Sequence, residues 1–208
     1  SRRPAPIGLP GEQVYAVRFL GDRAYVVTFR QVDPLYVLDL SNPADPLQAG
    51  ELKVTGFSES LFPLPGGLLL GVGKDADEQG FIKGVKVALF DVGNAAQPAL
   101  VQAQTFGTVG SATALDFSTH GISLFTVGNT TRVGLPMALR TSSDFAQPSS
   151  HALQRMEVDA QAKTMKVLTP LGATATNDGY GLLTTDRSLH IGEQVYFYSG
   201  GGVNGFAW

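Results

Sequence analysis

The same pattern recurs four times along the chain: a tight polar turn, a short apolar strand, a connection and a second apolar strand. The first strands are rich in β-branched and aromatic residues, and they lie at 24–29, 68–72, 122–127 and 195–199. Their partners lie at 35–40, 85–92, 152–158 and 203–208. Self-similarity at this spacing is typical of a repeat architecture, in which each unit buries its apolar faces against its neighbours. The sequence therefore constrains the architecture strongly and the chemistry weakly.

Each repeat extends to a four-stranded unit whose turns contain glycine or proline. The predicted units lie at 13–54, 60–106, 113–171 and 188–208, and the last holds only three strands. Four-stranded antiparallel units in series predict an all-β fold, namely a β-propeller with about three and a half blades in one partial domain over residues 1–208. A β-sandwich with the same number of strands is the alternative, and the repeat favours the propeller.

The incomplete last blade leaves two arrangements open. The chain is either the C-terminal part of a larger propeller, which we favour, or a four-bladed ring closed by the Pro-rich segment Ser1–Pro10. Blade edges that lack a neighbour expose backbone hydrogen-bonding groups and apolar faces. We therefore expect this chain to associate with itself.

The composition excludes several classes of partner and site. Among 208 residues the net charge is −3 and the basic residues do not cluster, which predicts no nucleic-acid partner. The absence of cysteine excludes disulfides and thiolate metal sites. No apolar run has the length of a membrane-spanning helix, so we expect no membrane span.

Four segments of the first half, VRFLGDRAYVVTF, DPLYVLDLSNPADP, GELKVTGFS and LLLGVGKDAD, resemble the bacterial and archaeal secreted β-propeller proteins that are distantly related to WD-repeat propellers. The ending RSLHIGEQVYFYSGGGVNGFAW is similar to the last blade of that family, whereas residues 128–150 match no family pattern. The resemblance implies an exported protein, secreted or held in the periplasm or cell envelope, and usually longer than this chain. It implies no established catalytic activity and no catalytic residues, so we expect a binding or scaffolding module and no enzyme.

Two connections between second and third strands are predicted to be long, those at 73–84 and 128–150. Insertions on one face of a repeat protein usually mark its binding face. We therefore expect a protein or another envelope component to contact the face that carries these two loops. The Ser-rich stretch 141–150 is expected to be a mobile loop tip.

A short acidic sequence in the first of these loops makes Asp75 and Asp77 candidate metal ligands. Alternating aspartates followed by Gly80 resemble the start of a calcium-binding loop, in which oxygen ligands surround a sharp turn. No glutamate follows at the position where such loops supply a bidentate ligand. A solvated acidic loop without a cation is the alternative, and we expect no other cofactor.

The three histidines are distributed over different predicted blades. His120 is expected in an exposed hairpin turn, and His190 on an innermost strand beside Arg187 and Asp186, whereas His151 receives no particular role. The alternative function is a hydrolase or lactonase-like propeller with a cation in its channel, which requires acidic or histidine side chains to converge there. Its candidate residues are Arg18, Glu59, Asp116 and His190. A third possibility is a purely structural spacer, while Trp208 is expected to pack on a neighbouring blade.

Overall fold

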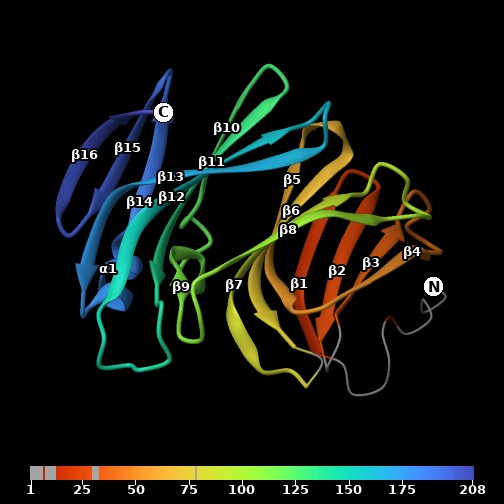
Figure 1. Ribbon diagram of the computed structural model, residues 1–208. Coiled ribbons are helices and arrows are strands. Elements are labelled where there is room, and N and C mark those ends of the chain that lie inside the picture. Colours follow the sequence, from red (N-terminus) through yellow and green to blue (C-terminus); the bar gives the residue numbers. More distant parts are fainter. Residues whose placement is uncertain (1–6, 8–12, 30–32, 78) are drawn as a thin grey trace. The chain divides into compact units, whose positions relative to one another are not determined.

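The computed structural model describes residues 7, 13–29, 33–77 and 79–208, and within them the chain is almost entirely antiparallel β-sheet (Figure 1). The chain divides into two compact units, residues 1–105 and 106–208, and each unit contains two sheets. This confirms the predicted all-β class and the succession of four-stranded antiparallel sheets. That residues 1–208 form one domain stays a prediction.

The first unit contains sheets A and B, whose strands are paired in the order of the sequence. The strands of sheet A are β1 (Gln13–Leu20), β2 (Arg23–Phe29), β3 (Asp33–Asp39) and β4 (Leu47–Val54). Those of sheet B are β5 (Phe57–Leu64), β6 (Leu68–Ala76), β7 (Ile82–Asp91) and β8 (Ala99–Phe106), with a 3-10 turn, η1 (Pro65–Gly67), between β5 and β6.

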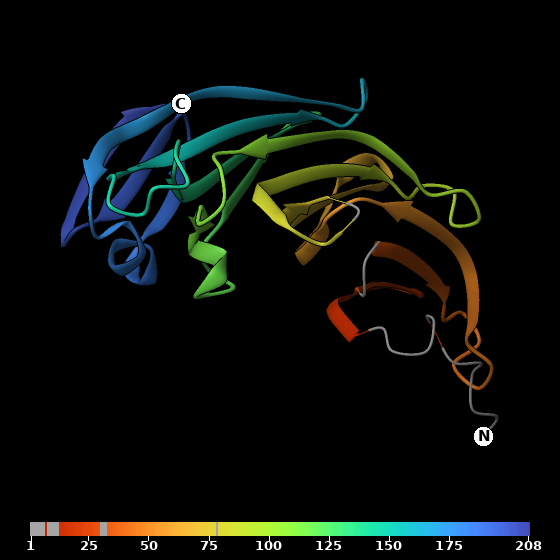
Figure 2. The same cartoon turned by 60° about the horizontal axis from the view of Figure 1, so that its bottom comes forward.

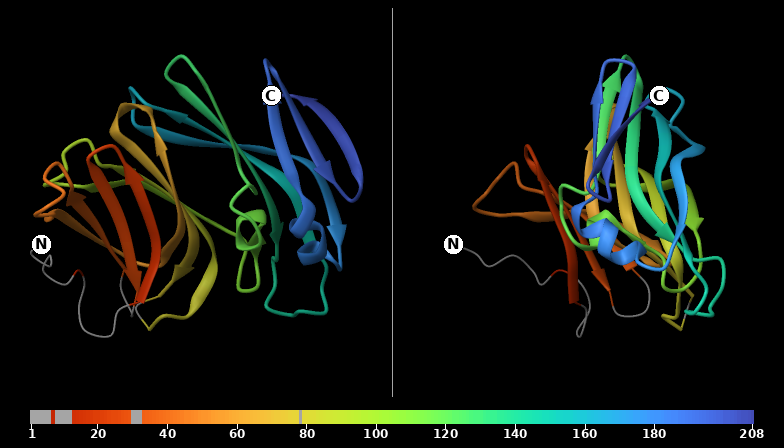
Figure 3. Two further views of the ribbon diagram at one scale, coloured as in Figure 1. Left: turned by 180° about the vertical axis from the view of Figure 1, so that it is seen from behind. Right: turned by 90° about the vertical axis from the view of Figure 1, so that its left-hand side faces the viewer.

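The second unit contains sheets C and D. Sheet C consists of β9 (Ala112–Thr113), β10 (Ser123–Val127), β11 (Thr130–Leu139), β12 (Ser149–Asp159) and β13 (Thr164–Thr176), with η2 (Ala114–Asp116) after β9. A short helix, α1 (Gly179–Thr185), leads into sheet D, which consists of β14 (Arg187–Ile191), β15 (Gln194–Ser199) and β16 (Gly202–Ala207). Figure 3 shows α1 directly before the start of β14. None of the helices in the described part of the chain is long and apolar enough to cross a membrane.

A repeated turn explains why sheets A and B have the same layout. Between β3 and β4, Asn42 Oδ1 accepts from the amide of Ala44 at 3.1 Å, and between β7 and β8, Asn94 Oδ1 accepts from the amide of Ala96 at 3.2 Å. Side-chain oxygens of Asn and Asp replace backbone acceptors in such turns. Asp39 opens the first of them, and the Ser41 hydroxyl and amide hold the pKa of its carboxyl below the ordinary value. The turn chemistry expected from the sequence is therefore present in both sheets.

Sheets A and B pack face to face through a large hydrophobic cluster. Val37, Leu69 and Phe90 are at most 1% exposed and come from β3, β6 and β7. Burial of one such side chain contributes about 1.5–3 kcal/mol relative to its exposure. Gly50 on β4 allows the close approach of the β7–β8 turn, because a Cβ atom at this position would lie 2.1 Å from the carbonyl oxygen of Ala95.

Sheets C and D also pack face to face, through Leu153, Val195 and Phe197, with Trp208 against the same cluster. Trp208 Nε1 donates to Glu157 Oε1 on β12 at 2.8 Å, which confirms that the tryptophan packs on the neighbouring sheet. Polar side chains lie in this interface as well, since the hydroxyls of Ser123 and Ser188 are 2.7 Å apart. The interface of the second unit is therefore mixed in polarity.

The prediction that residues 128–150 form a loop is wrong, because Thr130–Leu139 is the ten-residue strand β11 in the middle of sheet C. Gly134 and Pro136 gave this stretch the composition of a loop. On one side β11 pairs with β12 throughout, and on the other it pairs with β10 up to Gly134 and with β9 from Met137. Pro136 lies in the gap between these two partners, which is where a strand tolerates a residue without an amide hydrogen.

The predicted opening strand of the third blade, at 113–117, is also wrong in most of its length. β9 ends at Thr113, and a 3-10 turn follows because the Thr113 hydroxyl accepts from the amide of Leu115 at 3.2 Å. His120 lies in a turn, but this turn is no hairpin, since β9 and β10 both pair with β11. The first strand of sheet C is thus split into two short pieces.

Candidate functional site

The two predicted long loops are much shorter in the structure. β6 extends to Ala76 and β7 begins at Ile82, so the first connection is 77–81 and not 73–84. The second connection is 140–148, between β11 and β12. The turn at 140–148 lies at one end of sheet C (Figure 1 and Figure 2).

The connection at 140–148 is held by Arg140 and Asp144. The Arg140 guanidinium donates to the carbonyls of Asp144 at 2.6 Å and Gln147 at 2.9 Å, and it lies 4.6 Å from the centre of the Phe145 ring. Asp144 Oδ1 accepts from the amide of Ala146 at 2.9 Å. This turn is a third copy of the one found in sheets A and B. Its sequence therefore contained a signal for a strand ending just before it.

Asp75 and Asp77 line one cavity of about 430 Å³ together with Gln79 and Lys83, but one carboxylate oxygen of each already has a partner. Asp77 Oδ1 accepts from the amides of Gln79 at 3.1 Å and Phe81 at 2.9 Å, whereas Asp75 Oδ2 accepts from the Thr105 hydroxyl at 3.0 Å. Within the described residues, no group of three or more Asp, Glu or His is placed to hold a metal ion. Calcium binding by these two aspartates stays a prediction.

The candidate residues of the alternative hydrolase function each lie in a different local environment. Arg18 on β1 and Glu59 at an irregularity of β5 belong to the first unit, and Asp116 and His190 belong to the second. Asp116 accepts from the Thr113 hydroxyl at 3.1 Å. His190 packs between two aromatic rings, with ring centres 5.6 Å from that of Phe125 and 4.6 Å from that of Trp208.

His190 is buried, and neither of its ring nitrogens has a hydrogen-bond partner. Burial lowers the pKa of its imidazole, and the positive charge of Arg132 lowers it further. His190 is therefore a neutral interface residue. Asp186, which was expected to lie beside His190 at the channel, binds a different histidine.

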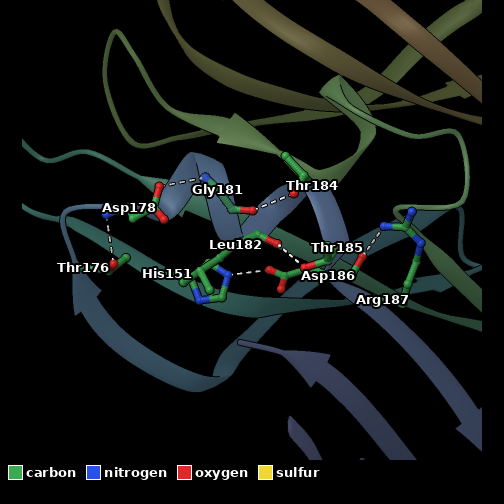
Figure 4. A network of polar contacts seen from close by, with 9 residues as sticks. All are labelled: His151, Thr176, Asp178, Gly181, Leu182, Thr184, Thr185, Asp186 and Arg187. Carbon is green, nitrogen blue, oxygen red and sulfur yellow. Dashed lines mark hydrogen bonds and ion pairs between the residues drawn. The ribbon is translucent and has the colours of Figure 1, made fainter. Parts of the chain in front are cut away.

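That histidine is His151, and its contact with Asp186 is the most buried polar pair of the second unit. His151 Nε2 lies 2.5 Å from Asp186 Oδ2, and the side chains are 3% and 0% exposed (Figure 4). β12 positions His151, and the residue after α1 positions Asp186, whose amide donates to the Leu182 carbonyl at 3.1 Å. Asp178 caps the helix by accepting from the amide of Gly181.

The pair adjoins a cavity of about 230 Å³ between sheets C and D and α1, which His151 and Ser199 help to line. The sequence pattern around His151 predicts no role for this residue. The two partners are 35 residues apart, and neither lies in a recognisable motif. The sequence contained one signal for this contact, namely Asp186 at the end of a short segment that interrupts the pattern of strands.

Antiparallel sheets of three to five strands, formed in sequence order and packed face to face in pairs, are the blades of a β-propeller. The family model described as "Beta propeller domain" matches residues 7–208, and the chain belongs to this family.

Two archaeal relatives share part of the chain. An uncharacterised protein of Methanocaldococcus jannaschii is 46% identical over 88 residues, and one of Archaeoglobus fulgidus is 49% identical over 87 residues. Each alignment covers 42% of this chain and 13% of the relative. The chain thus corresponds to a small part of these relatives.

Proposed function

We propose that this propeller is a binding and scaffolding module that contacts a protein partner or another component of the cell envelope, and that it has no catalytic activity. The observation that carries the proposal is the presence of two exposed phenylalanines on short turns that side-chain hydrogen bonds hold. Phe81 is 72% and Phe145 64% exposed. Exposed aromatic anchors on rigid supports supply much of the energy of protein interfaces.

Side-chain hydrogen bonds within both turns support this role. The Asp77 carboxylate binds two amides of its turn, and the Arg140 guanidinium spans the other turn while it contacts Phe145. Side-chain hydrogen bonds that restrain a turn reduce the conformational entropy that it loses when it binds. The anchors are therefore presented at low cost, as a binding surface requires.

The test is capture of envelope components by the intact chain and its variants. Phe81→Ser and Phe145→Ser should each remove a partner that the unaltered chain captures. Leu47→Ser on β4 is the matched control, since Leu47 is 59% exposed outside both turns. Undiminished capture by the folded double variant would contradict the proposal.

Self-association is the second part of the proposal, and the open face of sheet D supports it. Leu189, Ile191, Tyr196, Tyr198 and Val203 are all at least 36% exposed, and the strand register places them on the face opposite His190 and Phe197. A contiguous exposed apolar surface usually marks an interaction site. The solution mass should show a dimer that Ile191→Glu dissociates, and a monomeric unaltered chain would end this part of the proposal.

The proposal also places the protein outside the cytoplasm, as the family resemblance implies. Fractionation of producing cells should recover it with the envelope or the medium. The hydrolase alternative receives less support, because Asp116 and His190 each have a structural environment of their own. Turnover of ester or lactone substrates that is lost in His190→Phe would favour the enzyme instead.

A further inference from the structure

The cavity beside His151 has the composition of a small-molecule site. Its polar lining comes from His151, Thr174, Ser199 and Asn204, and its apolar lining includes Leu182 and Phe197. Small-molecule sites combine apolar walls with a few converging polar groups. These groups come from β12, β13, β15 and β16, so the packing of sheet C on sheet D assembles the site.

His151 is fixed in orientation by a partner that lies outside the cavity lining. Asp186 Oδ2 accepts from Nε2, and Figure 4 shows the other ring nitrogen, Nδ1, on the side away from this carboxylate. The ring also stacks on Phe197, with centres 5.9 Å apart. A histidine that donates through Nε2 presents Nδ1 as an acceptor in its neutral form. In its neutral form the ring therefore presents Nδ1 as an acceptor, and His151 is one of the residues that line the cavity.

The other polar groups that line the cavity determine which chemical groups a ligand must have. The hydroxyls of Thr174 and Ser199 and the carboxamide of Asn204 both donate and accept hydrogen bonds. No acidic or basic side chain other than His151 lines the cavity in the described part of the chain, so a charged ligand would enter without a counter-ion. A ligand hydroxyl matches these groups because it also donates and accepts.

We propose that this cavity binds a small neutral polyol, and this site is separate from the partner-binding turns. The volume of about 230 Å³ equals that of about eight water molecules at about 30 Å³ each. A molecule with a few hydroxyl groups fills this space. One hydroxyl donates to His151 Nδ1, and others exchange hydrogen bonds with Ser199 and Asn204.

The test follows the His151 ring and the Leu182 methyl groups by NMR during titration of the whole chain. The probes are glycerol, sodium acetate and methylammonium chloride. Glycerol should shift both sets of signals in a saturable manner, and the two ions should leave them unchanged. Saturable shifts with acetate in place of glycerol, or no saturable shift with any probe, would overturn the proposal.

Variants locate the binding without disturbing the core. Ser199→Ala and Asn204→Ala each remove hydrogen bonds at the cavity wall and should weaken glycerol binding about fivefold to tenfold. Thr164→Ala is the matched control, because it removes an exposed hydroxyl from β13 outside the cavity lining. Equal glycerol affinity in all three variants would show that the shifts arise elsewhere and would refute the site.

Discussion

The interface between sheets A and B and the interface between sheets C and D have the same architecture and different chemistry. The first is a continuous apolar cluster that includes Val37, Leu69 and Phe90. The second combines apolar residues with the His151–Asp186 pair and the Ser123–Ser188 contact. Across the first interface the Arg23 guanidinium donates to the backbone carbonyl of Val92, whereas the second interface buries a pair of polar side chains, which is costly. Polar side chains that stay buried at such a cost indicate the interface in which a ligand would bind.

Unsatisfied polar atoms show the same difference. Within the described part of the chain, the buried side-chain nitrogens and oxygens without a partner belong to Arg132, Arg140, Asp186 and His190, all in the second unit. A buried polar atom without a partner costs about 1–3 kcal/mol. Within the described residues, the unpartnered polar atoms that lower stability therefore lie in the second unit.

The largest expected effect is in the apolar interface. Phe90→Ala leaves a cavity among fully buried neighbours and should lower the free energy of unfolding by about 3–5 kcal/mol. Phe81→Ala, at an exposed site, should change it by less than about 0.5 kcal/mol. Denaturant titration measures both values, and similar losses in the two variants would show that sheet A does not pack on sheet B as described.

The polar interface should respond next most strongly. Asp186→Ala leaves His151 buried without its partner and should cost about 3 kcal/mol. Asp178→Ala removes only the cap of α1 and should cost about 1 kcal/mol. Equal losses in the two variants, measured by denaturant titration, would mean that Asp186 supports the helix and contributes nothing through His151.

The repeated turn should give equal effects in both units. Asn42→Ala, Asn94→Ala and Asp144→Ala each remove a side-chain acceptor of a turn amide, at an expected cost of about 1 kcal/mol. Thermal unfolding of the three variants compares them directly. A negligible effect at Asp144 alone would contradict the assignment of the third turn.

A smaller effect is expected from the titration of His190. Because its pKa in the folded protein lies below the ordinary value of about 6.5, the unfolded state binds more protons as the pH falls through that value. Stability should therefore be retained above this pH and decrease below it. Thermal midpoints measured from pH 8 to pH 5 should fall less in His190→Phe, and an unchanged pH profile in this variant would exclude the effect.

The smallest expected effect is that of calcium at Asp75 and Asp77. At a calcium concentration equal to the dissociation constant, binding would stabilise the fold by about 0.4 kcal/mol. A chelator should lower the thermal midpoint of the unaltered chain and leave that of Asp75→Ala unchanged. If the chelator has no effect on the unaltered chain, the loop is only a solvated turn.

Local chemistry made much of the fold predictable from sequence. The turns at Asn42 and Asn94 and the apolar strands of sheets A and B follow from side-chain capping and β propensity. β11 was missed because its glycine and proline resemble a loop, and only its two partner strands explain Pro136.

The polar site was not predictable in the same way. The contact between His151 and Asp186 depends on how β12 and α1 pack, and a contact across 35 residues leaves no local pattern. Asp75 and Asp77 do have a local pattern, but in the structure part of their oxygens serve the turn and Thr105.

The most direct test of this account is the NMR spectrum of the imidazole nitrogens. His151 should show a single tautomer with the proton on Nε2, and this proton should exchange slowly with water because Asp186 holds it in a buried hydrogen bond. The exposed His120 supplies the reference for fast exchange in the same sample. A His151 ring that exchanges its protons as fast as His120, with both tautomers present, would contradict the account.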